Sequence, residues 1–159
     1  MKHSVTNVVI AGLGGQGVLK ASDILGDLVF EAGLDVKKSE VHGMSQRGGS
    51  VSSDVRFGAG VFSPMVPPGE ADYLVVISAD QISVNQAALA KDGVLIEESQ
   101  IDATKLKSKK SVNVALLGVL SRHLEFSEDQ WLKAILGNLP ENLHEANKSA
   151  FRLGRNESK

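Results

Sequence analysis

The stretch NVVIAGLGGQGVLK, residues 7–20, decides the fold that this sequence predicts. Residues 7–11 are mostly apolar and rich in β-branched side chains, which is typical of a buried parallel strand, and they lead directly into a glycine-rich turn. Beyond the turn, apolar residues recur from Val18 to Ala32 with a helical period, and Gly33 follows as a helix stop. The glycines therefore lie at a strand–turn–helix junction.

The turn contains a G-x-G-x-x-G motif formed by Gly12, Gly14 and Gly17, with Gly15 and Gln16 between them. Glycine lets the backbone adopt a positive φ and lets a ligand approach closely, while a helix N-terminus offers unpaired N–H groups and a partial positive charge. The motif at this junction predicts an anionic or polar ligand. The alternative is that the glycines only permit a tight turn and close packing of helix against strand.

The rest of the chain alternates strands with helices. Residues 50–57 alternate apolar and polar side chains, so this strand is expected to have one polar face and to lie near a sheet edge or face a site. The pattern predicts an α/β three-layer αβα sandwich with a mostly parallel or mixed Rossmann-like sheet, and a single domain over residues 1–159. The other predicted strands are 34–41, 72–78 and 94–98. Four further helices are predicted: 80–93, which ends at Gly93; 112–124; one that begins at Ser127 with a capping box; and one from Pro140 to about Gly154.

Composition excludes several classes of function. The 159 residues are 42% hydrophobic and 23% charged with a formal net charge of −2, which is typical of a soluble globular protein and gives no indication of nucleic acid or an anionic membrane as partner. No apolar run approaches a membrane span and the N-terminus lacks a signal-peptide core, so a cytoplasmic location is expected. The basic stretch KLKSKK, residues 105–110, is interpreted as a solvated loop.

The chain contains no cysteine and its four histidines are scattered. It therefore offers no thiolate nucleophile, no cysteine-held iron–sulfur cluster, and no H-x-x-x-H motif or His/carboxylate pair at metal-ligand spacing. We predict no catalytic residue and no metal ligand on this chain. Any metal or redox centre that the protein uses is expected on another chain.

A second glycine-rich loop follows the second predicted strand, in the sequence EVHGMSQRGGSV at residues 40–51. Its polar side chains can donate hydrogen bonds to phosphate or carboxylate, and its two adjacent glycines remove side-chain bulk beside them. Because both glycine loops follow strands, a parallel sheet would bring them to the same carboxyl edge, where α/β proteins bind ligands. The predicted ligand-binding residues are Gly12, Gly14, Gly15, Gln16 and Gly17 in the first loop and Ser45, Gln46, Arg47, Gly48 and Gly49 in the second.

Two further residues are accessory candidates. Glu40 lies near the place where a dinucleotide site carries an acidic residue for the ribose hydroxyls, and His42 has a side chain suited to proton transfer near neutral pH. The simpler interpretation of both is structural: Glu40 ends a strand and His42 is a hydrogen-bonded loop residue. A complete dinucleotide fold also needs a second mononucleotide-binding half, for which the chain is too short.

Four segments carry a resemblance to a known family: GLGGQGVLKASDILG (12–26), EVHGMSQRGGSVSSDVRFG (40–58), VNVALLG (112–118) and NKSAFRLG (147–154). The sequence resembles the gamma-type subunits of 2-oxoacid:ferredoxin oxidoreductases, with the two glycine loops together as the specific signature. The H-G-M-S-Q run in the second loop is similar to the beta subunit of the indolepyruvate branch rather than to relatives acting on pyruvate or 2-oxoglutarate.

The resemblance implies a non-catalytic subunit of a complex that oxidatively decarboxylates a 2-oxoacid to an acyl-CoA and passes the electrons to ferredoxin. Thiamine diphosphate and the iron–sulfur clusters would be held by a larger partner subunit. This chain would contribute part of the active-site wall and part of a coenzyme A site shared at the interface, with no cofactor bound by this chain alone.

Several alternatives stay open at the level of sequence. The glycine loops could hold the phosphate-bearing end of coenzyme A, or seat the partner subunit, or do both. The chain could instead be a free-standing Rossmann-like nucleotide-binding enzyme or a stand-alone ligand-binding module. Exposed apolar residues on a partner-facing surface could also drive homodimer formation when the partner is missing.

Overall fold

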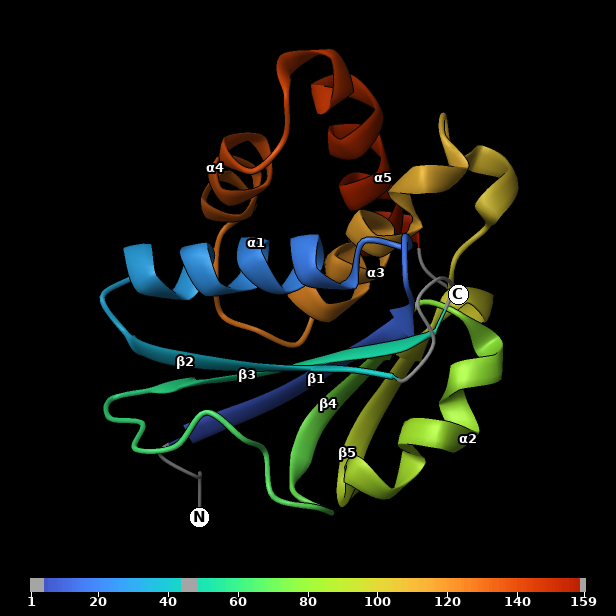
Figure 1. The fold of residues 1–159 in the computed structure, drawn as a ribbon. Coiled ribbons are helices and arrows are strands. Elements are labelled where there is room, and N and C mark those ends of the chain that lie inside the picture. Colours follow the sequence, from blue (N-terminus) through green and yellow to red (C-terminus); the bar gives the residue numbers. More distant parts are fainter. Residues whose placement is uncertain (1–4, 44–48, 158–159) are drawn as a thin grey trace.

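The computed structural model describes residues 5–43 and 49–157, which form an open five-stranded sheet with helices on both faces (Figure 1). The strand order is β2-β3-β1-β4-β5. β1 pairs in parallel with β4 and β4 with β5, whereas β3 runs antiparallel to both β1 and β2. The α/β fold is confirmed, with a mixed sheet. The strands are β1 (Val5–Leu13), β2 (Asp35–His42), β3 (Ser50–Gly58), β4 (Ala71–Val76) and β5 (Leu89–Glu97).

Four of the helices lie on one side of the sheet. α1 and α3 pack directly on the strands, and α4 and α5 lie outside them, α4 beside α1 and α5 beside α3 (Figure 1). The short helix α2 lies on the opposite side, where it covers only the β4–β5 part of the sheet. The helices are α1 (Val18–Glu31), α2 (Ile82–Asn85), α3 (Val112–Ser121), α4 (Glu128–Gly137) and α5 (His144–Glu157). None of the helices in the described ranges is both long enough and apolar enough to cross a membrane.

The alternating side chains of the strands build two cores of unequal size. The larger core lies between the sheet and α1 and α3, where Ile10, Leu25, Val55 and Leu116 are fully buried. On the opposite face, a smaller cluster around Leu74 packs against α2. β1, β4 and β5 contribute side chains to both cores, and all three end at the edge of the sheet that carries the glycine turn.

The helix predicted over residues 80–93 is wrong in its second half. The chain forms only α2 with short 3-10 turns on either side, and Leu89 already pairs with Ala71 of β4 as the first residue of β5. Gly93, predicted as a helix stop, lies within β5, where an added Cβ would be 2.7 Å from the Ala71 carbonyl oxygen. Pairing with β4 therefore overrides the helical preference of this segment.

Helix boundaries near the C-terminus are partly confirmed. Ser127 caps α4 with the predicted capping box, in which its hydroxyl accepts from the Gln130 N–H at 3.1 Å. The last helix, however, continues past Gly154 to Glu157. Gly154 is a packing residue, because a Cβ there would overlap the Ala115 carbonyl oxygen of α3.

The polar face of β3 lies where the alternation placed it, although β3 is the second strand and β2 forms the edge. Val51, Val55 and Phe57 belong to the larger core, so the polar side chains of β3 face away from α1. That face is crossed by the loop that connects β3 with β4 (Figure 1). The polar residues of β3 on this side are Ser52, Asp54 and Arg56.

Candidate functional site

The glycine turn between β1 and α1 has a backbone that only glycine adopts easily. Gly15 and Gly17 have φ values of 87° and 82°, in the left-handed region. Gln16 closes the turn twice: its N–H donates to the Leu13 carbonyl oxygen at 3.1 Å, and its side-chain Oε1 accepts from the Leu13 N–H at 2.7 Å. The turn is therefore fixed by its own hydrogen bonds, and Gln16, predicted as a ligand-binding residue, is part of this closure.

The glycines of the motif have different roles. A Cβ on Gly12 would lie 2.9 Å from Gln16 Oε1 and 3.0 Å from a Val18 methyl group, and a Cβ on Gly17 would overlap the Asn113 side chain. These two glycines permit close packing, which is the structural alternative raised by the sequence. Around Gly15, in contrast, an added Cβ would meet nothing within 4 Å. The turn is open to a ligand at Gly15.

The first turn of α1 supplies hydrogen-bond donors next to Gly15. The N–H groups of Val18, Leu19 and Lys20 come before the first N–H that donates within the helix, that of Ala21 to the Gly17 carbonyl oxygen at 3.0 Å, and the helix dipole adds partial positive charge at this end. Asn113, at the start of α3, is almost fully buried and donates from Nδ2 to the Gly17 carbonyl oxygen at 3.1 Å. This bond fixes α3 to the glycine turn.

The second glycine loop meets the first at its described end. The Gly14 N–H donates to the Gly49 carbonyl oxygen at 2.9 Å, and the Gly43 N–H donates to Ser50 at 2.6 Å across the base of the loop. The end of the second loop and the first loop therefore lie side by side at the carboxyl edge of β1 and β2. The predicted ligand-binding residues Ser45, Gln46, Arg47 and Gly48 lie outside the described residues.

A cavity of about 620 Å³ opens beside Gly15. Its walls come from segments directly after the carboxyl ends of three parallel strands: Gly15 after β1, Ile77 after β4 and Glu98 after β5. Ligands of open α/β sheets bind at this kind of edge. The other lining residues are Gln16, Ala103, Thr104, Leu106, Lys109, Lys110 and Val112.

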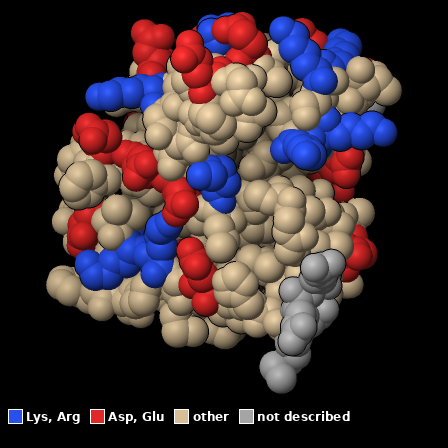
Figure 2. Space-filling model, turned by 45° about the horizontal axis from the view of Figure 1, so that its top comes forward, with Lys and Arg blue, Asp and Glu red and all other residues tan. Residues whose placement is uncertain are grey.

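Sequence reasoning missed the lysines of this cavity. The interpretation of residues 105–110 as a solvated loop is incomplete, because the exposed Lys109 and Lys110 also lie in the wall beside the glycine turn. Lys105 and Lys107 instead line a separate hollow against α5, where Lys105 Nζ lies 2.9 Å from Glu157 Oε2. In Figure 2 basic side chains gather toward the upper right, over the part of the chain that follows β5. Because Lys109 and Lys110 immediately precede α3, the helix start at Val112 was the signal that could have placed them at this edge.

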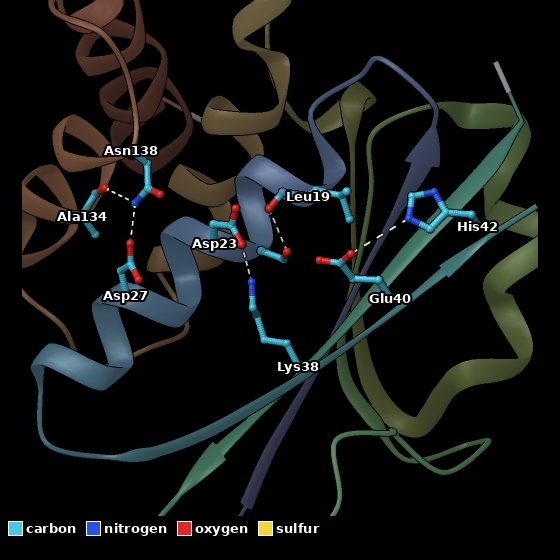
Figure 3. A network of polar contacts seen from close by, with 9 residues as sticks. Leu19, Asp23, Asp27, Lys38, Glu40, His42, Ala134 and Asn138 are labelled. Atoms are coloured by element: carbon cyan, nitrogen blue, oxygen red, sulfur yellow. Dashed lines mark hydrogen bonds and ion pairs between the residues drawn. The ribbon is translucent and has the colours of Figure 1, made fainter. Parts of the chain in front are cut away.

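Glu40 and His42 lie on the α1 side of β2 and point toward each other, with His42 Nε2 4.0 Å from Glu40 Oε2 (Figure 3). On the same face, Lys38 forms an ion pair with Asp23 that fixes β2 to α1. β3 lies between β1 and β2, which places Glu40 one strand spacing, about 4.8 Å, farther from the glycine turn than in a sheet where β2 adjoins β1. This arrangement does not suit the hydrogen bonds from an acidic side chain to the ribose hydroxyls that a dinucleotide site is expected to have.

Comparison with known proteins identifies the family of this chain. Residues 7–157 match the family model described as pyruvate ferredoxin/flavodoxin oxidoreductase. The indolepyruvate oxidoreductase subunit IorB of Thermococcus kodakarensis is 35% identical over an alignment of 188 positions that covers 93% of each chain.

Two solved structures share the fold. The gamma subunit of a keto/oxoacid ferredoxin oxidoreductase from Geobacter sulfurreducens has a TM-score of 0.79 at 23% identity, covering 94% of this chain and 96% of that one. The 2-oxoglutarate:ferredoxin oxidoreductase of Magnetococcus marinus, solved with 2-oxoglutarate, coenzyme A and succinyl-CoA bound, has a TM-score of 0.78 at 19% identity, covering 97% of this chain and 31% of that longer chain. By the extent of the family match and of the relative's identity, the chain belongs to the pyruvate ferredoxin/flavodoxin oxidoreductase family.

Proposed function

We propose that this chain is the small, gamma-type subunit of an indolepyruvate-type 2-oxoacid:ferredoxin oxidoreductase. The complex would oxidatively decarboxylate a 2-oxoacid to an acyl-CoA in the cytoplasm and pass the electrons to ferredoxin. The relationship to the indolepyruvate oxidoreductase subunit over 93% of both chains supports this assignment. Because the chain has no cysteine, the iron–sulfur clusters are assigned to a larger partner subunit. The resemblance to the family assigns thiamine diphosphate to the same partner.

Within the complex, the glycine turn and the adjoining cavity would hold the phosphate-bearing end of coenzyme A. The observation that carries this proposal is the N-terminus of α1 opening at Gly15 into a cavity with two lysines in its wall. Amide N–H groups, the helix dipole and ammonium groups all favour a phosphate at that place. The cavity wall also contains apolar side chains of Ile77, Leu106 and Val112, which suit the less polar remainder of the ligand.

The first experiment replaces the two cavity lysines in the assembled enzyme. The double variant Lys109→Ala, Lys110→Ala should raise the KM for coenzyme A by roughly a hundredfold or more, because each lost charge-assisted contact to phosphate is worth about 1.5–3 kcal/mol and about 1.4 kcal/mol corresponds to a factor of ten. The KM for the 2-oxoacid should change little. Steady-state kinetics with each substrate varied in turn measures both.

Lys107→Ala is the matched control, since Lys107 belongs to the same basic stretch but lines the other hollow. An unchanged KM for coenzyme A in the double variant, or an equal rise in the Lys107→Ala enzyme, would contradict the proposed site.

Arg47→Ala tests the second loop in the same assay. We expect a higher KM for coenzyme A with thiamine diphosphate binding intact. An unchanged KM for coenzyme A would remove Arg47 from the site.

A further inference from the structure

The loop between β3 and β4, residues 59–70, carries two exposed apolar side chains. Phe62 is 98% exposed and Met65 is 58% exposed. The loop lies on the side of the sheet turned away from α1, in green at the lower left of Figure 1. Single apolar residues on a surface are ordinary, so exposure alone assigns no role to Phe62.

What distinguishes this loop is how firmly it is held. The Val61 N–H donates to Asp35 Oδ2 at 2.8 Å, and the Val66 N–H donates to Asp54 Oδ2 at 2.9 Å. Between them, Arg56 Nη1 donates to the Ser63 carbonyl oxygen at 2.8 Å. These hydrogen bonds therefore fix the backbone immediately before and after Phe62, and on either side of Met65.

The side chains flanking the two exposed residues point inward. Val61 is only 2% exposed, and Val66 packs against the smaller core of the sheet. Three prolines, Pro64, Pro67 and Pro68, further restrict the backbone. Because little freedom remains to be lost, an apolar side chain held in this way binds a partner at a low entropic cost.

We infer that Phe62 and Met65 are the anchor by which this chain docks into an apolar socket on the larger subunit of the oxidoreductase. The nearby charged groups, Asp54 and Arg56, are already engaged with the loop backbone, so the anchor itself offers apolar surface and calls for an apolar socket. Buried aromatic anchors of this kind carry much of the affinity of protein interfaces. The inference rests on the proposed function, which supplies the partner.

A second copy of this chain fits the loop less well. One aromatic side chain buries about 150–250 Å², so a symmetric pairing of two such loops would bury far less than the roughly 1,200–2,000 Å² of a stable interface. A larger subunit could contact other surfaces of this chain as well, so the loop would not have to supply the whole buried area of a stable interface. In the Magnetococcus marinus protein, the matched region is 31% of one longer chain, so there this fold is covalently joined to other parts of the enzyme.

The test measures the affinity of the purified chain for the purified larger subunit by calorimetry. Phe62→Ser should weaken binding by roughly tenfold or more, as expected for loss of an interface anchor. Its thermal midpoint should equal that of the wild type, since Phe62 is already exposed. Phe30→Ser is the matched control: Phe30 is 67% exposed and lines a hollow between α1 and α4, on the other side of the sheet.

Each outcome decides the assignment. Selective weakening by Phe62→Ser supports it, while unchanged affinity or equal weakening by Phe30→Ser overturns it and leaves the proposed function intact. Failure of the wild-type chain to bind the larger subunit overturns the proposed function and the anchor together. If light scattering shows that Phe62→Ser abolishes a homodimer of the isolated chain without changing affinity for the larger subunit, the occupant is a second copy and the inference is wrong.

Discussion

Two glycines set the distance between α3 and α5. A Cβ on Gly118 would overlap the Phe151 carbonyl oxygen, and one on Gly154 would overlap the Ala115 carbonyl oxygen. The helices therefore cross with backbone against backbone, and Phe151 is carried into the core beside Trp131, with ring centroids 5.6 Å apart. At this crossing the absence of a side chain is itself the packing feature.

Gly154→Ala should destabilise the protein by about 3 kcal/mol or more, because the methyl group has no space unless α5 moves away from α3. Gly137→Ala, at the end of α4, is the control: an added Cβ meets nothing within 4 Å there, and the change should be neutral or slightly stabilising. Urea denaturation of the two variants measures the difference. Equal midpoints for Gly154→Ala and the wild type would show that the crossing is looser than described.

The sequence predicted the glycine turn but could not assign a role to each glycine. The sequence predicts Gly12, Gly15 and Gly17 alike as ligand-binding residues, whereas the structure gives Gly12 and Gly17 packing contacts and leaves Gly15 open. The contact that excludes a side chain at Gly17 comes from Asn113, which is 96 residues away in the chain. Such a contact depends on the packing of α3 and has no local signal.

At the scale of elements, the β3–β4 loop depends on the carboxylate of Asp35 in β2. The hydrogen bond from the Val61 N–H is the main cause that holds the pKa of Asp35 below its usual value of 3.8, against the opposing effect of burial. The Lys37 ammonium, 3.5 Å away, acts in the same direction as that hydrogen bond. The charged carboxylate is therefore favoured in the folded state.

Because the pKa is lowered on folding, the stability contributed by Asp35 is present above about pH 3.8 and is lost as the pH falls through the lower folded-state value. Asp35→Ala should lower the thermal midpoint at pH 7, and its difference from the wild type should narrow as the pH is reduced toward 3. Asp92→Ala, at an exposed position of β5, serves as the control. A difference that stays constant from pH 7 to pH 3 would contradict this account of the loop.

Elements were predictable where the local pattern and the tertiary contacts agree. β1 with its glycine turn, the stop of α1 before Gly33 and the cap at Ser127 all follow from local chemistry, and the structure has each of them. The segment after Asn85 was not predictable in this way, since its alanines favour a helix while its pairing with β4 makes a strand. Lys109 and Lys110 were not predictable from local sequence either, because they lie beside the glycine turn only since α3 begins at the carboxyl edge of the sheet.

At the scale of the whole molecule, the two surfaces to which we assign roles lie apart. The glycine turn and its cavity lie at the carboxyl edge of β1, β4 and β5. The β3–β4 loop crosses the face of the sheet that is turned away from α1, where it covers the polar side chains of β3. The separation lets the chain dock on a partner through the loop while the cavity stays open to a ligand.

The most direct measurement of the central claim is hydrogen–deuterium exchange of the assembled enzyme, followed by mass spectrometry with and without coenzyme A. We predict slower exchange on adding coenzyme A in peptides covering residues 13–20 and 103–112, with no change in residues 59–70, which complex formation alone should protect. Unchanged exchange in residues 13–20 at saturating coenzyme A, or protection confined to the partner subunit, would contradict the account.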